Sequence, residues 1–385
     1  MPDGHLAPTF VFGDNVHANY SSVEELVTVL RTVDAIPVAV GSGTINDVTK
    51  LAAHQVGRPY VVVATAASMD GYTAYGASIT RDGSKSTFSC PAPRAVVADL
   101  DVICKAPAGL NASGYADMIA KNAAGGDWIL ADAAGVEAID GPAWNCVQGP
   151  LRHWLSDPTG VSMGDPTAIR HLINGLMISG FAIQALQSSR PASGADHQFS
   201  HLWDMQNHTF NGVPPSHGFK VGIGTLASLA LYEYLLHRDF QGMSVSSTVE
   251  NWPTLQEREA RIAEIMGSGE LAAVALQETR AKHLSHDDLG RQLARLQDAW
   301  PSLTARLRRH LFRFDEARDM LRAAGCPFEP EQIGISRPRL RTSYEMARSI
   351  RRRYTVLDYA EQTGAWDAAM QQIFGQSGQW PIGEE

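Results

Sequence analysis

The chain has 385 residues, of which 44% are hydrophobic and 19% charged, a composition typical of a globular protein rather than a disordered one. Its 32 basic and 41 acidic residues give a net charge of −9, which argues against nucleic acid as the main partner. No run approaches the roughly 18 to 20 uncharged apolar residues of a membrane span, and the opening residues MPDGHLAPTF lack the features of a secretory signal. The four cysteines are far apart and form no CxxC pair, so we expect no disulfide framework, no cysteine zinc site and a cytoplasmic location.

The first hundred residues alternate between short apolar runs and helical periodicity. Apolar runs rich in β-branched residues predict strands, and segments with apolar positions three or four residues apart predict helices. The predicted strands are 8–14, 36–43, 59–66 and 94–103, and the predicted helices are 21–33, with a serine at its cap, and 44–55. Strands separated by helices in this way are typical of a parallel sheet that helices cover on both faces.

After Pro107 the pattern changes to helical periodicity alone. The segments that carry it are 112–137, 165–188, 219–237, 253–280, 286–324 and 341–377. No convincing strand lies between them, so we predict a helical bundle. The boundary falls in KAPAGLNASG (105–114), whose proline, glycines and small residues suit a linker. The expected organisation is an α/β domain over residues 1–107 and an all-α domain over 108–385.

Two polar loops follow neighbouring predicted strands. Residues 41–47 (GSGTIND) lead into a helix, where glycines allow close backbone approach and the helix N-terminus offers free N–H groups to a phosphate. The loop lacks the full GxGxxG fingerprint, so a phosphate site and a plain tight turn both stay open. Residues 65–72 (TAASMDGY) follow the next strand, and ligands of open parallel sheets bind beyond the carboxyl ends of the strands. Asp70 in that loop could contact a substrate hydroxyl or simply cap a turn.

Histidines and a carboxylate occur at three predicted helix starts. His197 and His201 are four residues apart and share one helical face, although 13 histidines in the chain make such a pair common by chance. His217 begins another helix, and Asp117, near the start of a third, is followed one turn later by Lys121. One carboxylate and two imidazoles with open positions left would form a catalytic metal site, because structural zinc sites close with four protein ligands. Spacing alone does not show that these helix starts converge.

Six segments together resemble the bacterial sn-glycerol-1-phosphate dehydrogenases, which belong to the superfamily of glycerol dehydrogenase, iron-containing alcohol dehydrogenases and dehydroquinate synthase. The resemblance runs from about residue 8 to residue 360, and RPASG-x-x-H-x-x-x-H (190–201) is its most specific part. The segments are GSGTINDVTK (41–50), TAASMDGYTA (65–74), SGYADMIAKNAAGGDW (113–128), SSRPASGADHQFSHLWDM (188–205), HGFKVGIGTL (217–226) and IRRRYTVLDYA (350–360).

The resemblance implies a dehydroquinate synthase-like fold with the active site in a cleft between a dinucleotide-binding sheet and a helical metal-binding domain. Asp117, His197 and His217 would hold one divalent ion, zinc or nickel, and His201 would contact substrate rather than metal. Asp117 would also lie against the substrate, as would Asp70. The implied contacts of NAD or NADP are Gly41, Gly43, Thr44, Ile45, Asn46, Asp47, Thr65, Ala66, Ala67, Ser68 and Ala74.

Three departures from the family concern the cofactor half. Members usually carry several dozen residues before the segment that matches residue 8, including a strand and a helix, so we expect a shortened cofactor domain or a misplaced start. Members tend to have proline where Ala64 and Ala67 stand, and Ala74 replaces a hydroxyl residue that usually approaches the cofactor. We therefore expect the chain to bind dinucleotide weakly.

An arginine-rich segment near the C-terminus has a structural explanation. Within residues 337–354 (RPRLRTSYEMARSIRRRY), Leu340, Tyr344, Ala347 and Ile350 are spaced as one buried face. We therefore favour a solvated or interdomain helix over a nucleic-acid-binding segment.

The expected function is an NAD(P)-dependent, metal-dependent dehydrogenase that interconverts dihydroxyacetone phosphate and sn-glycerol 1-phosphate. The metal would polarise the ketone oxygen, and the nicotinamide would supply the hydride. Asp117 and His201 are the predicted catalytic residues, the proton coming through bound water or the His201 side. Lys121 or Lys220 would meet the substrate phosphate. The alternatives are a related polyol dehydrogenase, a dehydroquinate synthase-type cyclase and a non-catalytic relative.

The expected partners follow from this function and from the composition. We expect a small phosphorylated substrate, no nucleic acid, no membrane span and a homodimer or higher homo-oligomer.

Overall fold

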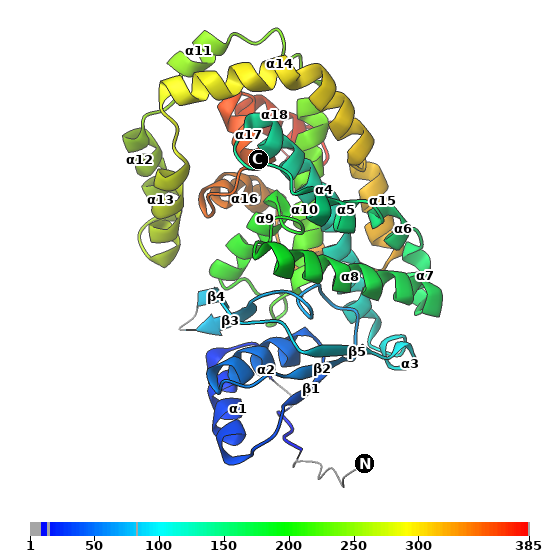
Figure 1. Cartoon of the computed structure of the whole chain (residues 1–385). Coiled ribbons are helices and arrows are strands. Elements are labelled where there is room, and N and C mark those ends of the chain that lie inside the picture. Colours follow the sequence, from blue (N-terminus) through cyan, green and yellow to red (C-terminus); the bar gives the residue numbers. More distant parts are fainter. Residues whose placement is uncertain (1–8, 14–15, 82–83, 384–385) are drawn as a thin grey trace.

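The computed structural model describes residues 9–13, 16–81 and 84–383. The N-terminal part, at the bottom of Figure 1, mixes helices and strands, and the larger part above it is built from helices. This arrangement confirms the predicted fold class, an α/β unit with a parallel sheet followed by a helical unit.

A three-stranded parallel sheet forms the centre of the α/β part. In spatial order its strands are β1 (Val38–Gly41), β2 (Val61–Ala64) and β5 (Ala95–Ala98). Gly41 lies opposite Ala64, and Ala64 lies opposite Ala98, so the carboxyl ends of the strands are level. The loops that follow β1 and β2 therefore lie side by side, as ligand-binding loops do in open parallel sheets.

Helices α1 (Tyr20–Thr32) and α2 (Gly43–Gln55) confirm the two predicted helices of this part. The predicted serine cap of α1 is wrong, because Asn19 takes that position and its Oδ1 accepts the backbone N–H of Ser22 at 2.9 Å. Asparagine satisfies a free N–H at a helix start as well as serine does, so the helix begins one residue earlier than predicted.

The two faces of the parallel sheet differ in burial. On one face Val62 is buried and packs with Ala53 of α2. On the other face Val38, Val40 and Val97 are 58%, 62% and 48% exposed. Among the described residues, the predicted helical cover is therefore confirmed for one face only.

Two predicted strands differ from the structure. Residues 9–13 form no strand, and the ends of the predicted strand 8–14 lie outside the described residues. Phe10 and Phe12 account for that apolar run, because both pack against the cluster between α1 and α2. The predicted strand 94–103 ends at Ala98, since the side chain of Asp99 then caps the short helix α3 (Leu100–Ile103).

An antiparallel hairpin is present that the sequence analysis does not predict. It pairs β3 (Ala77–Arg81) with β4 (Ser84–Phe88). In β3 only Ala77 and Ile79 are buried, so the segment contains no apolar run of the kind that predicts a strand. The hairpin lies beneath the helical part in Figure 1, and β4 contacts helix α9 (Ala195–Met205).

The helical part begins with the 27-residue helix α4 (Ala108–Ala134), directly after Pro107. The stretch 105–114, predicted as a linker, is therefore helical from Ala108 onward. The other helices are α5 (Gly141–Gln148), α6 (Leu151–Trp154), α7 (Pro158–Met163), α8 (Pro166–Leu186), α10 (His217–His237), α11 (Val245–Glu250), α12 (Leu255–Met266), α13 (Glu270–Lys282), α14 (His286–His310), α15 (Phe314–Ala323), η1 (Pro330–Ile333), α16 (Arg337–Ser349), α17 (Val356–Gln362) and α18 (Trp366–Phe374).

Three predicted helical segments are divided in the structure. The segment 253–280 breaks between α12 and α13 at Gly267 and Gly269, whose φ angles of 68° and 139° suit glycine rather than a helix interior. The segment 286–324 is divided into α14 and α15, and the segment 341–377 is divided among α16, α17 and α18. In the described part of the chain no named β-strand follows β5, and the elements after it are helices. This confirms the predicted helical bundle.

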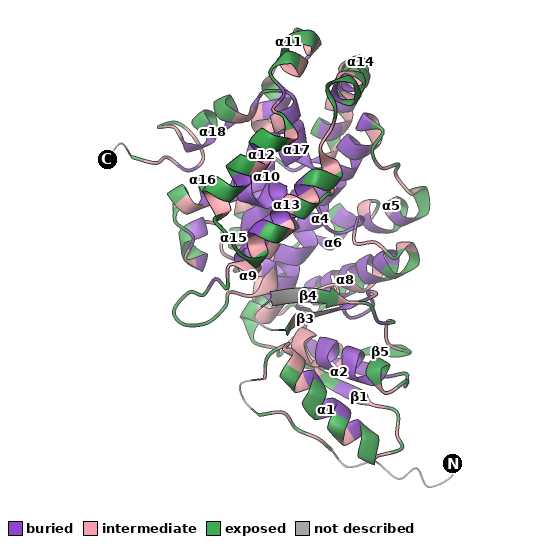
Figure 2. Ribbon diagram, turned by 90° about the vertical axis from the view of Figure 1, so that its left-hand side faces the viewer, coloured by how far each residue is buried: buried purple, intermediate pink, exposed green. Residues whose placement is uncertain are grey.

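Helices α4 and α10 form the buried centre of the helical part (Figure 2). Among the described residues, α10 is the one helix long and apolar enough to cross a membrane, and 83% of its most apolar window is buried inside the fold. It is therefore a core helix here. The arginine-rich segment forms α16, and Leu340, Tyr344, Ala347 and Ile350 are all buried, which confirms the predicted buried face.

Candidate metal centre and adjoining loops

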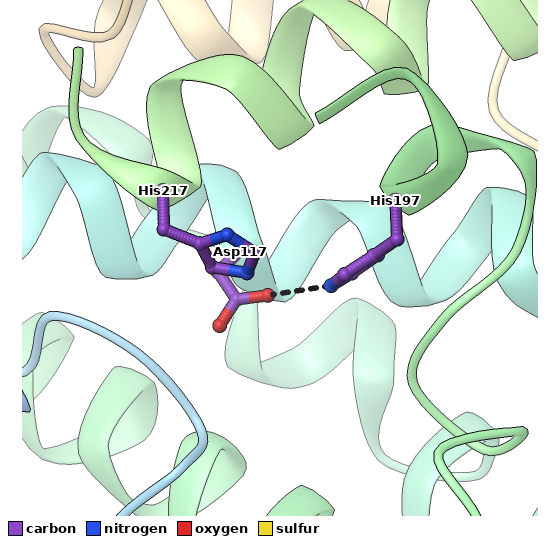
Figure 3. A group of neighbouring side chains, drawn as sticks. All are labelled: Asp117, His197 and His217. Carbon is purple, nitrogen blue, oxygen red and sulfur yellow. Dashed lines mark ion pairs between the residues drawn. The ribbon is translucent and has the colours of Figure 1, made fainter. Parts of the chain in front are cut away.

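Three helices bring a carboxylate and two imidazoles together. Asp117 lies in α4, His197 in the first turn of α9, and His217 is the first residue of α10. One ligand atom from each lies within 4.8 Å of the other two. Figure 3 shows the Asp117 carboxylate between the two rings, with His197 Nε2 3.7 Å from Asp117 Oδ1. The structure thus brings together the three predicted metal ligands.

Close helix packing explains the convergence. A Cβ on Gly218, next to His217, would lie 1.8 Å from the backbone oxygen of Ser113 in α4. A Cβ on Gly224 would lie 2.3 Å from the backbone oxygen of Asp196 in α9. These glycines let α10 approach both other ligand-bearing helices backbone to backbone, which no larger side chain allows.

The ring of His197 is oriented by its neighbour Asp196. The Asp196 Oδ2 atom forms a hydrogen bond with His197 Nδ1, and its Oδ1 accepts the N–H of Gly194 at 3.1 Å. Nδ1 is thereby engaged, and Nε2 is left facing Asp117. Metal-binding histidines characteristically make such a bond through the second ring nitrogen. One carboxylate and two imidazoles suit a zinc-type catalytic site with an open position, so the residues present fit a divalent ion.

His201 lies one turn further along α9 and is half-buried. Its ring centroid is 6.1 Å from that of His197 and 6.3 Å from that of His217. The ring is therefore beside the candidate ligand set. Its role toward substrate stays a prediction.

A buried ion network connects the metal centre to the loop after β2. Lys121 Nζ lies 2.6 Å from Asp117 Oδ1 and 2.8 Å from Asp70 Oδ2, and Ser179 Oγ donates to Asp70 Oδ2 at 3.0 Å. Asp117 and Lys121 are fully buried. Burial by itself lowers the pKa of Lys121, but the two carboxylates outweigh it and raise that pKa, so the amine is charged. Lys121 thus neutralises two carboxylates, and its predicted contact with substrate stays a prediction.

Lys220, the other predicted partner of a substrate phosphate, is also buried. Its Nζ forms an ion pair with Asp204 Oδ1. Both predicted lysines therefore have carboxylate partners in this structure.

The two predicted cofactor loops meet at the carboxyl edge of the sheet. The N–H of Thr65 donates to the oxygen of Gly41 at 3.1 Å, and Met69 packs against Gly43. Asn46 and Asp47 are buried and bonded within the protein, Asn46 to Tyr60 and Asp47 to the N–H of Ser78. Thr44 and Ile45 are half-buried beside them. Contact of these residues with NAD or NADP stays a prediction.

The loop after β2 packs directly on α4. Asn111 Oδ1 accepts the N–H of Ala67 at 2.9 Å, and a Cβ on Gly114 would lie 1.8 Å from the oxygen of Ala67. The other predicted cofactor residues of the loop, Ala66, Ser68 and Ala74, are also buried. The cofactor loop and the metal-bearing helix are thus in direct contact.

Lys50 is a further buried residue that the sequence analysis does not single out. Its Nζ donates to the backbone oxygens of Gly71, Ala74 and Gly76 at 2.8, 2.9 and 3.0 Å. Burial lowers the pKa of Lys50, and the nearby Asp47 carboxylate partly opposes this. Lys50 thus holds the loop after β2 in place. Its position at the end of the GSGTINDVTK segment (41–50) is the sequence feature from which it could have been found.

Asp127, in the second half of α4, is another buried residue that the sequence analysis does not single out. Its Oδ2 accepts the N–H of Ala195 at 2.7 Å, and its Oδ1 accepts the N–H of Val356 at 2.8 Å and the hydroxyl of Tyr232 at 2.6 Å. Ala195 and Val356 are the first residues of α9 and α17, so one carboxylate caps two helices, including the helix that carries His197. Burial raises the pKa of Asp127 to about 7, while the bonds from Tyr232 and Ala195 partly oppose it.

The fold thus joins an α/β unit with a parallel sheet to a helical unit. The helical unit supplies a carboxylate and two imidazoles beside the loop after β2, and these side chains form a candidate metal centre. Residues 6–107 match the family model described as iron-containing alcohol dehydrogenase. Over 94% of this chain and 84% of the other, the structure is similar to a probable glycerol dehydrogenase from Sinorhizobium meliloti, with a TM-score of 0.55 and 18% identity. A sulfoacetaldehyde reductase from Bifidobacterium kashiwanohense, solved with NAD+, gives a TM-score of 0.55 at 14% identity and covers 95% and 85% of the two chains.

The family model thus matches residues 6–107, and the chain as a whole has the dehydroquinate synthase-like fold of these solved dehydrogenases.

In sequence the chain is similar to proteins named glycerol-1-phosphate dehydrogenase (NAD(P)+). The one from Halalkalibacterium halodurans is 37% identical over 195 residues, which are 51% of this chain and 49% of the relative. The one from Geobacillus stearothermophilus is 28% identical over 351 residues, which are 91% of this chain and 77% of the relative. The chain spans between 49% and 62% of the length of the first three relatives that it matches.

Proposed function

We propose that the protein is an oxidoreductase that uses NAD(P)H and a divalent ion to reduce dihydroxyacetone phosphate to sn-glycerol 1-phosphate, reversibly. The observation that carries the proposal is the convergence of Asp117, His197 and His217 beside the loop after β2. The likeness to the Geobacillus glycerol-1-phosphate dehydrogenase, which runs over 91% of this chain, supports the choice of substrate.

In this proposal Asp117, His197 and His217 hold one zinc or nickel ion, with Asp196 orienting the ring of His197. Such an ion polarises a carbonyl oxygen, and a nicotinamide supplies hydride. The protein's part is to hold the substrate carbonyl and the cofactor loop at a fixed distance. Lys121 serves this purpose, because it ties Asp117 to Asp70 on that loop.

His201 is proposed to handle the proton that completes the alcohol. It shares the helix face of His197 and lies beside the ligand set, so it can reach a substrate oxygen without taking a ligand position. A positioned histidine contributes a factor of about 100 to 10,000 in proton transfer.

The remaining proposals concern the setting of the enzyme. All four cysteines are free, which supports a reducing, cytoplasmic location. We propose domains over 1–107 and 108–385, and a homodimer or higher homo-oligomer whose size light scattering would measure.

The test is an assay on the purified chain loaded with zinc or with nickel. Oxidation of NADH or NADPH should follow the addition of dihydroxyacetone phosphate, and the product should resist a dehydrogenase specific for sn-glycerol 3-phosphate. Activity on glycerol or dihydroxyacetone, without activity on dihydroxyacetone phosphate, would favour a polyol dehydrogenase. Conversion without net oxidation of the cofactor would favour cyclase chemistry, and no cofactor binding would favour a non-catalytic relative.

A further inference from the structure

A substrate that carries a phosphate needs cationic groups near the metal centre. Lys121 and Lys220 are both buried in ion pairs with carboxylates, Lys121 with Asp117 and Asp70, and Lys220 with Asp204. Neither amine offers an uncompensated positive charge to an incoming dianion. The cations that serve a phosphate must therefore come from elsewhere near the ligand-bearing helices.

Two arginines after α16 lie against the residues that lead into α9. Arg353 donates to the oxygen of Ser193 at 2.7 Å and to Ser189 Oγ at 3.0 Å. Arg351 reaches Ser193 Oγ at 3.5 Å. Ser193 is buried and directly precedes Gly194, the N-cap of α9. Both arginines are half-buried, so part of each residue remains accessible to solvent.

Neither guanidinium forms an ion pair with a carboxylate in the part of the chain that the structure describes. The charge of Glu278 acts on Arg351 and that of Glu137 acts on Arg353, but Glu278 is paired with Arg352 and Glu137 with Arg190. Asp196, also nearby, is bonded to His197 and to the N–H of Gly194.

The positive charges of Arg351, Arg353 and Arg190 also repel one another. Burial, followed by the charges of Arg351 and Arg190, lowers the pKa of Arg353. Burial likewise lowers the pKa of Arg351. A cluster of guanidiniums without matching carboxylates is stabilised by a bound anion, and arginine's planar fork suits the oxygens of a phosphate.

We propose that Arg351 and Arg353, with Ser193 between them, form the subsite that binds the phosphate monoester of the substrate. The two arginines contact the segment that enters α9, and Ser193 lies four residues before His197, one of the candidate metal ligands. This inference rests on the proposed reduction of a phosphorylated ketone, and it names the residues that select a phosphorylated substrate over an uncharged one.

The matched pair of variants is Arg351→Gln and Arg352→Gln. Both remove one positive charge from adjacent positions, but Arg352 is exposed and pairs with Glu278 at 2.8 Å. Two readouts apply to the metal-loaded protein: the affinity for inorganic phosphate by calorimetry, and the KM values for dihydroxyacetone phosphate and for uncharged dihydroxyacetone. Metal content and thermal unfolding are measured on each variant.

For Arg351→Gln we expect the phosphate affinity to fall about 10- to 100-fold, because the variant loses a hydrogen bond to a charged group. The KM for dihydroxyacetone phosphate should rise by a similar factor, while metal content and turnover of dihydroxyacetone stay unchanged. Arg352→Gln should behave like the wild type. If Arg351→Gln does not fold, Arg351→Lys should give a smaller loss, because lysine keeps the charge without the fork.

Equal phosphate affinity and KM in the Arg351 and Arg352 variants would overturn the subsite while leaving the proposed reaction standing. So would a wild-type protein that binds no phosphate. Phosphate binding that depends on Arg351 in a protein that does not reduce dihydroxyacetone phosphate would keep the subsite and overturn the reaction instead.

Discussion

Asp70 donates its backbone N–H to Oδ2 of Asp117 at 3.1 Å, so the loop after β2 is hydrogen-bonded to the carboxylate of the candidate metal centre. Lys121 joins the same two residues through their side chains. The loop that is expected to meet the cofactor and the helix that is expected to hold the metal are thus one connected unit. Changes at one should therefore be felt at the other.

Lys121→Met tests this connection. The substitution leaves the carboxylates of Asp117 and Asp70 close together in a buried place without a cation, which costs about 3–5 kcal/mol in unfolding free energy. Metal affinity should also fall, because Asp117 loses the bond that fixes its orientation. Denaturant titration and zinc titration measure the two effects. Lys105→Met, at an exposed position, is the control, and a Lys121 variant as stable as that control would refute the network's importance.

His201→Ala should separate chemistry from metal binding. Metal content should stay near that of the wild type, since the side chain lies beside the ligand set, and turnover should fall about 100-fold with the loss of a proton-handling group. His54→Ala, an exposed change on α2, should alter neither quantity. Loss of metal in the His201 variant would show that His197 and His201 must exchange roles.

Gly224→Ala should disturb the metal centre without touching a ligand. Its methyl group would lie 2.3 Å from the oxygen of Asp196, so α9 must shift and His197 with it. We expect a loss of about 1–3 kcal/mol in unfolding free energy, as in overpacked cores, together with weaker zinc binding. Gly109→Ala, where no atom lies within 4 Å, should be neutral or slightly stabilising. Similar zinc affinity in both variants would contradict the packing explanation.

Asp127 should make stability depend on pH. Its folded pKa is about 7 against an ordinary 3.8, so the unfolded chain releases this proton at lower pH than the folded chain does. Asp127 therefore makes its full contribution to the free energy of unfolding below about pH 4, and this contribution declines as the pH rises toward 7. Denaturant titrations from pH 4 to 8 should show this decline in the wild type relative to Asp127→Asn. Parallel pH profiles for the two proteins would contradict the raised pKa.

The sequence predicts the fold class and names Asp117, His197 and His217 as candidate ligands, but it does not show how these three residues are brought together. Asp117, His197 and His217 stand out by residue type and family resemblance, whereas their convergence depends on backbone contacts at Gly218 and Gly224. Those contacts join residues far apart in the chain, so no local pattern records them.

The features that the sequence analysis does not predict correctly also depend on contacts that no local pattern records. Asp127 caps two helices from the second half of a third, a tertiary role that leaves no spacing signal. The β3–β4 hairpin lacks an apolar run, and the predicted strand at 8–14 is an apolar segment that packs through Phe10 and Phe12 without pairing.

The most direct test of the account is the metal content of the wild type and of His197→Ala after dialysis against trace zinc. The structure predicts about one ion per wild-type chain and almost none in the variant, because the remaining carboxylate and imidazole cannot complete the site. Equal metal in the two proteins would contradict the assignment of Asp117, His197 and His217 as the metal centre.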